Sequence, residues 1–326
     1  MKRLLGFALP IFACVMLAGA CGTTEKSQEP QDNAAAGGPV TVTDNRGKQV
    51  KLDAPARKVV GLEWGEVEML VTLGVMPVGV ADVKGYGTWV TSAKLDPGVK
   101  DVGTRSEPSV DSIVALQPDL VVMEEMRDAN LATQLEKFVP VIVLKGSDAS
   151  RNLERMREDF KLIAQAVGKT DVAAKVLGEF DAALADGKQK IAAKGNAGKE
   201  FAIADGWKEG STVSIRMFGQ GALVSQVAIQ LGLKNAWNGK VDEAWGLGAT
   251  DVEGLSPLKS ADIHFFYNAS DGDDVFTSGL AGNAIWDSMP FVQRKQLHKM
   301  PDGIWTFGGP ASCRQYIDAL LKVYAA

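Results

Sequence analysis

The strongest constraint on the fold is a long helical pattern that runs from Lys169 to Ala193. Apolar side chains recur every four residues along it, and no proline interrupts it. The positions that carry this period are Val172, Val176, Phe180 and Leu184. Such a helix is longer than the typical helix of a globular protein. The sequence therefore predicts one long, rigid helix with a large stretch of chain on either side.

The segments on either side of this helix share a pattern. Residues 109–123 and 251–266 each begin with a capping residue, Val and an acid, and continue through a Leu and a short polar turn to a strand-like run. Strands that alternate with short helices are typical of a parallel sheet covered on both faces. We therefore predict an α/β fold of two similar lobes with mostly parallel sheets, at 40–168 and 195–326, joined by a spine helix at 169–194.

Shorter patterns predict individual elements of the lobes. Alternation around an Asn-Arg-Gly turn predicts a hairpin at 40–52. In the C-terminal lobe we expect strands at 201–204, 213–218 and 304–307 and a closing helix at 315–324. Two lobes with a cleft between them indicate ligand capture.

Residues 1–20 have the pattern of an export signal, because Lys2 and Arg3 precede an apolar run shorter than a typical membrane span. The run ends in Leu-Ala-Gly-Ala-Cys, which resembles a bacterial lipoprotein signal that leaves Cys21 as the lipidated N-terminus. An ordinary secretory signal with an incidental Cys is the alternative. Residues 21–39 have the composition of a flexible tether. A tether needs a fixed end, so we expect a lipid anchor on the extracytoplasmic face of the cell membrane.

Composition agrees with an exported protein that binds no nucleic acid. Cys14 leaves with the signal and Cys21 carries lipid, so we expect Cys313 to be a lone, buried, inert thiol. Without Lys2 and Arg3, the 35 basic residues become 33 against 40 acidic ones, a net charge of −7. A mildly acidic surface without a block of Lys and Arg argues against nucleic acid. We expect a monomer.

Few residues suit catalysis or metal binding. His264 and His298 are the only histidines of the sequence, whereas a zinc or manganese site needs several His or Cys ligands. We expect His264 to be a core residue and His298 to lie in a basic loop. A Ser-His-Asp hydrolase would depend on these two, and no Gly-x-Ser-x-Gly elbow exists. Candidate phosphate loops at 166–170 and 219–224 lack required glycines. We predict no catalytic residues, no metal site and no enzyme.

Aromatic and arginine side chains in predicted loops are more informative. Five tryptophans fall at or just beyond the ends of predicted elements: Trp64, Trp89, Trp207, Trp245 and Trp305. Any one of them could be a structural ring, but five together indicate a ligand cleft. Trp237 and Trp286 lie in apolar contexts typical of packing. Arg105, at a strand-to-helix junction, presents a fixed fork of donors to the expected cleft, and a surface ion pair with Glu107 is the alternative.

Seven stretches from Val59 onward, which cover both lobes, carry a resemblance to a known family. They are GLEWGEVEMLVTLGVMPVGVAD, GTWV, VGTRSEPSVDSIVALQPDLVV, MFGQGALVSQVAIQLGLKNAWNG, AWG, IWDSMPFV and IWTFGGP. In this order they resemble the substrate-binding proteins of iron–siderophore and vitamin B12 ABC importers, above all those that bind ferric hydroxamates. The resemblance implies two α/β lobes bridged by one long helix, which limits hinge motion. It also implies capture of an iron(III)–hydroxamate siderophore and its delivery to an ABC permease.

The resemblance assigns expected roles to single residues. Arg105 matches the arginine that donates hydrogen bonds to iron-bound hydroxamate oxygens. The pocket aromatics of the family are matched by Trp89, Trp245 and Trp305, and Phe307 stands in place of a Tyr. The family's Tyr from the first lobe has no counterpart here, where Met126 and Arg127 are nearest. We add Trp64, Trp207 and Arg216 as further candidates for ligand binding.

Two acids at equivalent places in the lobes, Asp111 and Glu253, each lie one turn into a predicted helix. Compensation of the helix dipole is one interpretation, and it contributes about 0.3–1 kcal/mol per acid. In the resembled family, acids at these places protrude from each lobe and pair with arginines of the permease. We therefore predict that both acids dock on a permease.

The ligand chemistry agrees with the scarcity of histidine. A hexadentate siderophore occupies all six positions on iron(III), so the protein needs no metal ligand and no cofactor of its own. Acidic loop residues, namely Glu63, Glu107, Asp242 and Glu243, lead to the hypothesis that a cationic or neutral chelate is preferred over an anionic one. The alternatives are a cobalamin- or haem-binding lipoprotein of the same fold and, in another class, an exported enzyme on a two-lobed scaffold.

Overall fold

The computed structural model describes residues 37–125, 129–210, 212–270, 272 and 274–326. The predicted export signal, Cys21 and most of the predicted tether lie outside these ranges, as do Met126 and Arg127. Residues Gly37–Ala326 form one compact unit. No helix within the described ranges combines the length and the apolar character that a membrane span requires.

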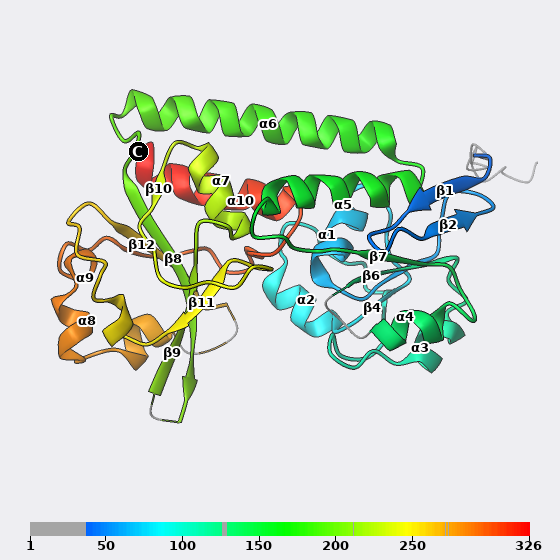
Figure 1. Ribbon diagram of the computed structural model, residues 1–326, viewed down its shortest axis with the longest axis horizontal. Coiled ribbons are helices and arrows are strands. Elements are labelled where there is room, and N and C mark those ends of the chain that lie inside the picture. Colours follow the sequence, from blue (N-terminus) through cyan, green and yellow to red (C-terminus); the bar gives the residue numbers. More distant parts are fainter. Residues whose placement is uncertain (1–36, 126–128, 211, 271, 273) are drawn as a thin grey trace, which may run out of the picture. The chain divides into compact units, whose positions relative to one another are not determined.

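Helix α6 (Thr170–Ala193) runs past both lobes along one side of this unit (Figure 1). It packs against α5 (Asn152–Ala166) of the N-terminal lobe, and against α7 (Leu223–Gln230) and α10 (Pro310–Tyr324) of the C-terminal lobe. Its buried side chains, Phe180 among them, follow the helical period that the sequence shows. The predicted long spine helix is confirmed.

The N-terminal lobe is built on a parallel sheet with the strand order β5-β4-β3-β6-β7. These strands are β3 (Val59–Gly61), β4 (Gly79–Val80), β5 (Lys100–Asp101), β6 (Leu120–Glu124) and β7 (Val141–Leu144). Its helices are α1 (Trp64–Thr72), α2 (Val83–Trp89), α3 (Val110–Ala115) and α4 (Ala129–Leu135). The predicted hairpin consists of β1 (Val40–Thr43) and β2 (Gln49–Leu52). The α/β prediction is confirmed for this lobe.

The C-terminal lobe contains a mixed sheet with the strand order β11-β9-β8-β12-β13, and β10 pairs with β8. These strands are β8 (Glu200–Glu209), β9 (Thr212–Phe218), β10 (Lys234–Asn235), β11 (Leu247–Thr250), β12 (His264–Asn268) and β13 (Leu297–Lys299). Very few residues separate β8 from β9, so these strands pair antiparallel and extend past the others (Figure 1). β11 is antiparallel to β9 as well. This part of the sheet is therefore an exception to the predicted, mostly parallel arrangement.

Three other sequence predictions for the C-terminal lobe need correction. Residues 304–307 form irregular backbone and a turn instead of a strand, and His298 lies on β13 instead of in a loop. The closing helix starts at Pro310, because proline suits the first turn of a helix. In the second copy of the repeated pattern, the helix is only the 3₁₀ turn Glu253–Leu255, since Gly254 and Pro257 do not support a longer helix.

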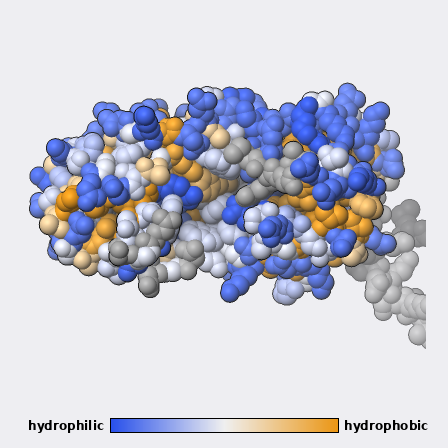
Figure 2. All heavy atoms as spheres, turned by 60° about the horizontal axis from the view of Figure 1, so that its bottom comes forward, coloured by the Kyte–Doolittle hydropathy of each residue, from blue (hydrophilic) through white to orange (hydrophobic). Residues whose placement is uncertain are grey.

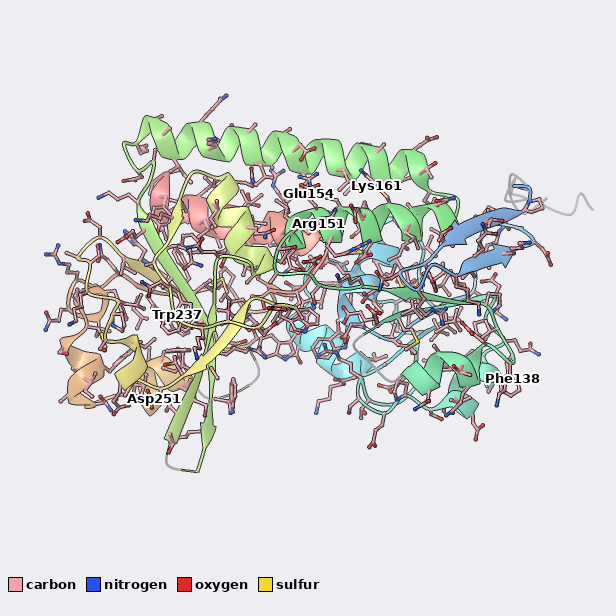
Figure 3. All side chains as sticks on the ribbon, viewed as in Figure 1. Phe138, Arg151, Glu154, Lys161, Trp237 and Asp251 are labelled. Carbon is pink, nitrogen blue, oxygen red and sulfur yellow. The ribbon has the colours of Figure 1, made fainter. Side chains whose placement is uncertain are left out.

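Three further short helices cover the apolar core of this lobe. They are η2 (Val275–Gly279), α8 (Ala284–Ser288) and α9 (Pro290–Gln293). Trp237 and Trp286 are buried in that core, as predicted. Phe138 of the N-terminal lobe, in contrast, is exposed. Trp237 and Phe138 are both labelled in Figure 3. Hydrophilic side chains occupy much of the face shown in Figure 2, with smaller hydrophobic areas between them. Cys313 is buried and free, and burial raises the pKa of its thiol.

The segment that leads into α10 returns to the N-terminal lobe. The backbone N–H and the hydroxyl of Thr91 both donate to the Gly303 carbonyl, at 2.9 Å and 3.0 Å. Trp305 packs in an apolar cluster of the N-terminal lobe together with Trp64 and Tyr86. The two lobes are therefore joined through this segment as well as through α6.

Candidate functional site

A cavity of about 300 Å³ lies between the lobes, and residues of both lobes line it. The N-terminal lobe contributes Glu63, Gly65, Arg105 and Glu124, and the C-terminal lobe contributes Arg216, Trp245, Leu247, Trp305 and Phe307. A second, smaller space shares Gly65, Glu124, Trp245 and Phe307 with this cavity and is lined by Glu66 and Asp159 as well. The carboxyl ends of β3 and β6 lead into these walls, which is where open parallel sheets usually bind ligands.

Arg105 is held in place from three directions. Its Nε–H donates to Oε1 of Glu63, a carboxylate that is almost fully buried. The guanidinium lies 4.2 Å from the ring centroid of Trp64 and 5.3 Å from that of Trp305. Burial lowers the pKa of Arg105, but a guanidinium keeps its charge. Its ion-pair partner among the described residues is thus Glu63 and not Glu107.

An aromatic wall continues from Arg105 across the cavity. Trp305 meets Trp64 edge to face at a centroid distance of 5.0 Å and Phe307 at 5.1 Å. Phe307 in turn meets Trp245 at 5.3 Å, and Trp89 lies behind Trp305 at 6.0 Å. Such ring pairs hold one another in place and offer apolar area to an organic ligand.

The predicted site residues occupy two layers. Arg105, Arg216, Trp245, Trp305 and Phe307 line the cavity itself. Behind them, the indole N–H of Trp64 donates to the Ala81 carbonyl at 3.2 Å, and Trp64 and Trp89 support the ring of Trp305. The ligand-binding role of these seven residues, and of Trp207, stays a prediction.

Arg216 and Trp207 lie together on the hairpin of the C-terminal lobe. The Arg216 Nε–H donates to Oδ1 of Asp205 at 2.9 Å, and the second carboxylate oxygen accepts from the same guanidinium. The guanidinium lies 5.5 Å from the Phe307 centroid and 5.9 Å from that of Trp207, which is 42% exposed. Trp207 thus does not line the cavity itself but lies next to Arg216, which does.

Two buried acids in the cavity wall, Glu66 and Glu124, were not predicted. They are 3% and 5% exposed, and each carboxyl group affects the pKa of the other. Burial is the main reason that the pKa of Glu124 is raised to about 7, and burial together with the charge of Glu124 raises the pKa of Glu66 well above its ordinary value. One sequence signal could have found Glu124, since it ends the apolar run 120–123 at the carboxyl end of a parallel strand.

The two predicted docking acids are exposed, one on each lobe. Asp111 lies in the first turn of α3, whose first residues are capped by the Ser109 hydroxyl. Glu253 is the first residue of its 3₁₀ turn. Both side chains are thus accessible to a partner, and their docking role stays a prediction. Within the described ranges, no group of three or more His, Cys, Asp or Glu side chains is arranged to hold a metal ion.

Known proteins share this architecture. The iron(3+)-hydroxamate-binding protein FhuD of Escherichia coli is 25% identical over 263 residues, which cover 81% of this chain and 85% of that protein. The probable siderophore-binding lipoprotein YfiY of Bacillus subtilis is 24% identical over 330 residues, 99% of this chain and 98% of the relative. The solved structure of FhuD from Vibrio cholerae, a siderophore-binding protein bound to Fe3+–Desferal, has a TM-score of 0.69 at 24% identity, covering 83% of this chain and 98% of the other.

A family model described as periplasmic binding protein matches residues 59–303, which is well over half of the sequence. This range contains the parallel sheet of the N-terminal lobe, the mixed sheet of the C-terminal lobe and the residues that line the cavity, except Trp305 and Phe307. The expected family resemblance is thereby confirmed. The chain belongs to the periplasmic binding protein family, whose members are substrate-binding proteins of ABC importers and not enzymes.

Proposed function

We propose that this protein captures an iron(III)–hydroxamate siderophore in the cavity between its lobes and delivers it to an ABC permease. The observation that carries the proposal is the position of Arg105, a charged fork of donors fixed between two indole rings at a partly buried cavity wall. Hydroxamate oxygens carry negative charge even when they bind iron, and hydrogen bonds to such oxygens are strong in a desolvated site. The rings of Trp245, Trp305 and Phe307 suit the organic shell of the chelate.

The names of relatives support this ligand class. The Escherichia coli relative is named for iron(3+)-hydroxamate binding, and the Vibrio cholerae structure contains Fe3+–Desferal. A chelate that already fills the coordination sphere of iron requires neither a protein ligand to the metal nor a cofactor. The acids of the cavity wall, Glu63 and Glu124, favour a cationic or neutral chelate over an anionic one.

A tryptophan-fluorescence titration tests the ligand class directly. The panel consists of a ferric hydroxamate, a ferric catecholate, ferric citrate, cobalamin and haem. We expect the hydroxamate to bind most tightly. Haem is a weaker candidate, because no Tyr or His is among the described residues that line the cavity. Tighter binding of the anionic catecholate or of cobalamin would overturn the assignment.

Replacing Arg105 tests the residue on which the proposal depends. Arg105→Ala removes charge-assisted hydrogen bonds of about 1.5–3 kcal/mol, so affinity for the ferric hydroxamate should fall roughly 10- to 100-fold. Arg294→Ala is the matched control, because Arg294 is an exposed arginine at the end of α9. Unchanged affinity in Arg105→Ala, measured on protein that unfolds like the wild type, would contradict the proposal.

Delivery to a permease rests on the exposed acids of the two lobes. We infer that Asp111 and Glu253 pair with basic residues of the permease. Asp111→Arg and Glu253→Arg should then abolish uptake of the chelate by cells, while affinity in solution stays unchanged because neither acid lines the cavity. Normal uptake in the double variant would exclude this docking mode.

The lipid anchor at Cys21 is a further part of the proposal. The Bacillus subtilis relative YfiY is named a lipoprotein, which supports an anchored, extracytoplasmic protein. Cys21→Ser should release the protein from the membrane fraction, and retention of that variant would argue for another means of attachment. We expect the released protein to be a monomer in gel filtration.

A further inference from the structure

The cavity wall contains a pair of carboxyl groups whose hydrogen bonding is incomplete. Glu124 ends strand β6, and Glu66 lies in the first turn of α1. Both side chains are more than nine-tenths buried, and each keeps one oxygen, Oε2, without a hydrogen-bond partner. Glu124 lines the main cavity, and both line the smaller space that adjoins it. The unpartnered oxygens thus belong to side chains of the cavity wall.

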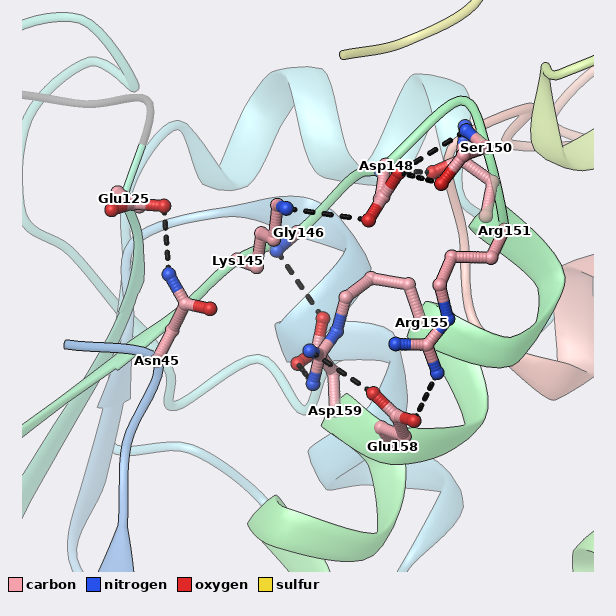
Figure 4. Close-up of polar contacts among 11 residues, drawn as sticks. Asn45, Glu125, Lys145, Gly146, Asp148, Ser150, Arg151, Arg155, Glu158 and Asp159 are labelled. Carbon is pink, nitrogen blue, oxygen red and sulfur yellow. Dashed lines mark hydrogen bonds and ion pairs between the residues drawn. The ribbon is translucent and has the colours of Figure 1, made fainter. Parts of the chain in front are cut away.

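The cations near this pair are engaged by other acids. Arg105 pairs with Glu63, Arg216 pairs with Asp205, and Arg155 pairs with Asp159 at 2.7 Å. Asp159 accepts from the Gly146 N–H at 3.2 Å in addition, as Figure 4 shows. In the part of the chain that the structure describes, neither Glu66 nor Glu124 takes part in an ion pair. The wall therefore contains more buried acid than buried base.

An unpaired buried carboxylate is unfavourable by several kcal/mol, so a protein retains it only where something compensates. Because both acids line the same small space and burial raises the pKa of Glu124 to about 7 and that of Glu66 well above its ordinary value, the pair carries at most one negative charge near neutral pH. A protonated amine would supply what is missing, since it carries a positive charge and three donors and has no acceptor. A neutral or anionic group would compensate less well for the two oxygens that lack hydrogen-bond partners.

We propose that Glu66 and Glu124 form a subsite for the protonated primary amine of a siderophore whose iron-binding part lies against Arg105. This inference rests on the proposed function and adds the charge and the functional group of the chelate. Arg105 and Glu124 line the same cavity, so one ligand can contact both at once. Specificity then comes from two opposite charges in one cavity, one for the hydroxamate oxygens and one for the amine.

Two chelates that differ only at the amine test the subsite. The iron(III) complex of Desferal is a linear tris-hydroxamate that ends in a primary amine, and acetylation of that amine removes its charge. We expect the wild type to bind the free-amine form at least about tenfold more tightly than the acetylated form at pH 8, as a charge-assisted hydrogen bond implies. At pH 6 the ratio should be smaller, because the carboxyl pair is then more protonated while the amine stays charged.

Glu124→Gln should bring the ratio of the two affinities to within about twofold, since the amide cannot provide the charge. Glu125→Gln is the matched control, because the next residue is an exposed acid that accepts from Asn45 and lies outside the cavity wall. Thermal unfolding of each variant, with and without chelate, verifies that the fold is retained.

The outcomes separate the two proposals. If the wild type binds both chelates equally, or if the preference survives in Glu124→Gln, the amine subsite is refuted while hydroxamate binding stands. Binding of neither chelate would refute the proposed function and the subsite together. A tenfold preference that disappears in Glu124→Gln and persists in Glu125→Gln supports both.

Discussion

Helix α1 carries two buried acids, Glu66 and Glu68, whose surroundings differ. Oε1 of Glu68 accepts from the backbone N–H groups of Ala311 and Ser312, both at 3.0 Å. These groups begin α10, and Gly309 at the N-cap has no side chain to offer them. Glu68 therefore caps a helix of the other lobe, whereas Glu66 lies near a second buried carboxyl group, that of Glu124.

The comparison shows that a buried carboxylate oxygen without a hydrogen-bond partner is not enough to indicate a ligand site. Oε2 of Glu68 lacks a hydrogen-bond partner too, but it lies against the backbone of Gly308, where a Cβ atom would come within 2.3 Å of it. The corresponding oxygens of Glu66 and Glu124 belong to side chains that line a cavity. Access from the cavity, more than the missing hydrogen bond, therefore distinguishes the subsite from the structural acid.

Glu68→Ala tests the structural side of this comparison and should have the largest effect. It removes the acceptor of two helix N–H groups, and the free energy of unfolding should fall by about 3 kcal/mol. Urea denaturation measures the change. Glu68→Gln keeps an acceptor oxygen and should lose clearly less stability. Equal, small losses in both variants would mean that Glu68 does not cap α10 in solution.

Glu124→Gln should change stability in the opposite direction. The raised pKa of Glu124, about 7 against an ordinary 4.5, means that the folded state disfavours its charged form. The stability that this group contributes is complete below pH 4.5 and is lost as the pH rises through 7. The variant should therefore be more stable than the wild type by about 2 kcal/mol at pH 8, and about equal to it at pH 4.5.

Urea denaturation at the two pH values measures this difference, with Glu125→Gln as the control that should match the wild type at both. A destabilised Glu124→Gln at pH 8 would indicate that the carboxylate is compensated within the folded protein.

A smaller pH effect arises in the sheet of the C-terminal lobe. His264 Nδ1 and His298 Nε2 lie 2.8 Å apart on neighbouring parallel strands. Burial and the neighbouring His298 lower the pKa of His264 to about 4, and burial lowers that of His298. Both histidines therefore favour unfolding as the pH falls from 6.5 toward 4, a slope opposite to that of Glu124.

His298→Gln should flatten the acid limb of the wild-type stability profile by a small amount, because both rings are only half-buried. The decrease in stability that Glu124 causes between pH 4.5 and 7 should then be easier to recognise in the profile. An unchanged profile would show that the histidine pair does not contribute to the pH dependence.

Local periodicity explains what the sequence could predict. The period of α6 and the alternation of β1 and β2 are visible in single segments, and both elements form as expected. The tryptophans around Arg105 could be identified as candidate site residues because they fall at or just beyond the ends of predicted elements. The antiparallel pairing of β8 with β9 was missed because the predicted strand ended at residue 204, whereas β8 continues to Glu209 and very few residues separate it from β9.

The buried acids were missed for a related reason. In the sequence Glu66 and Glu68 look like the solvent-facing residues of a short amphipathic helix. Their burial depends on Glu124 and on the start of α10, which lie 58 and 242 or more residues away along the chain. Only the assembled fold reveals that one acid meets helix N–H groups and the other meets a carboxyl group.

The return of residues 303–312 to the N-terminal lobe has a consequence for how the lobes can be separated. Trp305 fills a hydrophobic cluster of that lobe, and Glu68 holds the first turn of α10. A protease cut within α6 would therefore leave both halves associated. An isolated N-terminal fragment would expose the apolar surface that Trp305 covers, so expression of single lobes should yield aggregation-prone material unless the C-terminal segment is supplied with them.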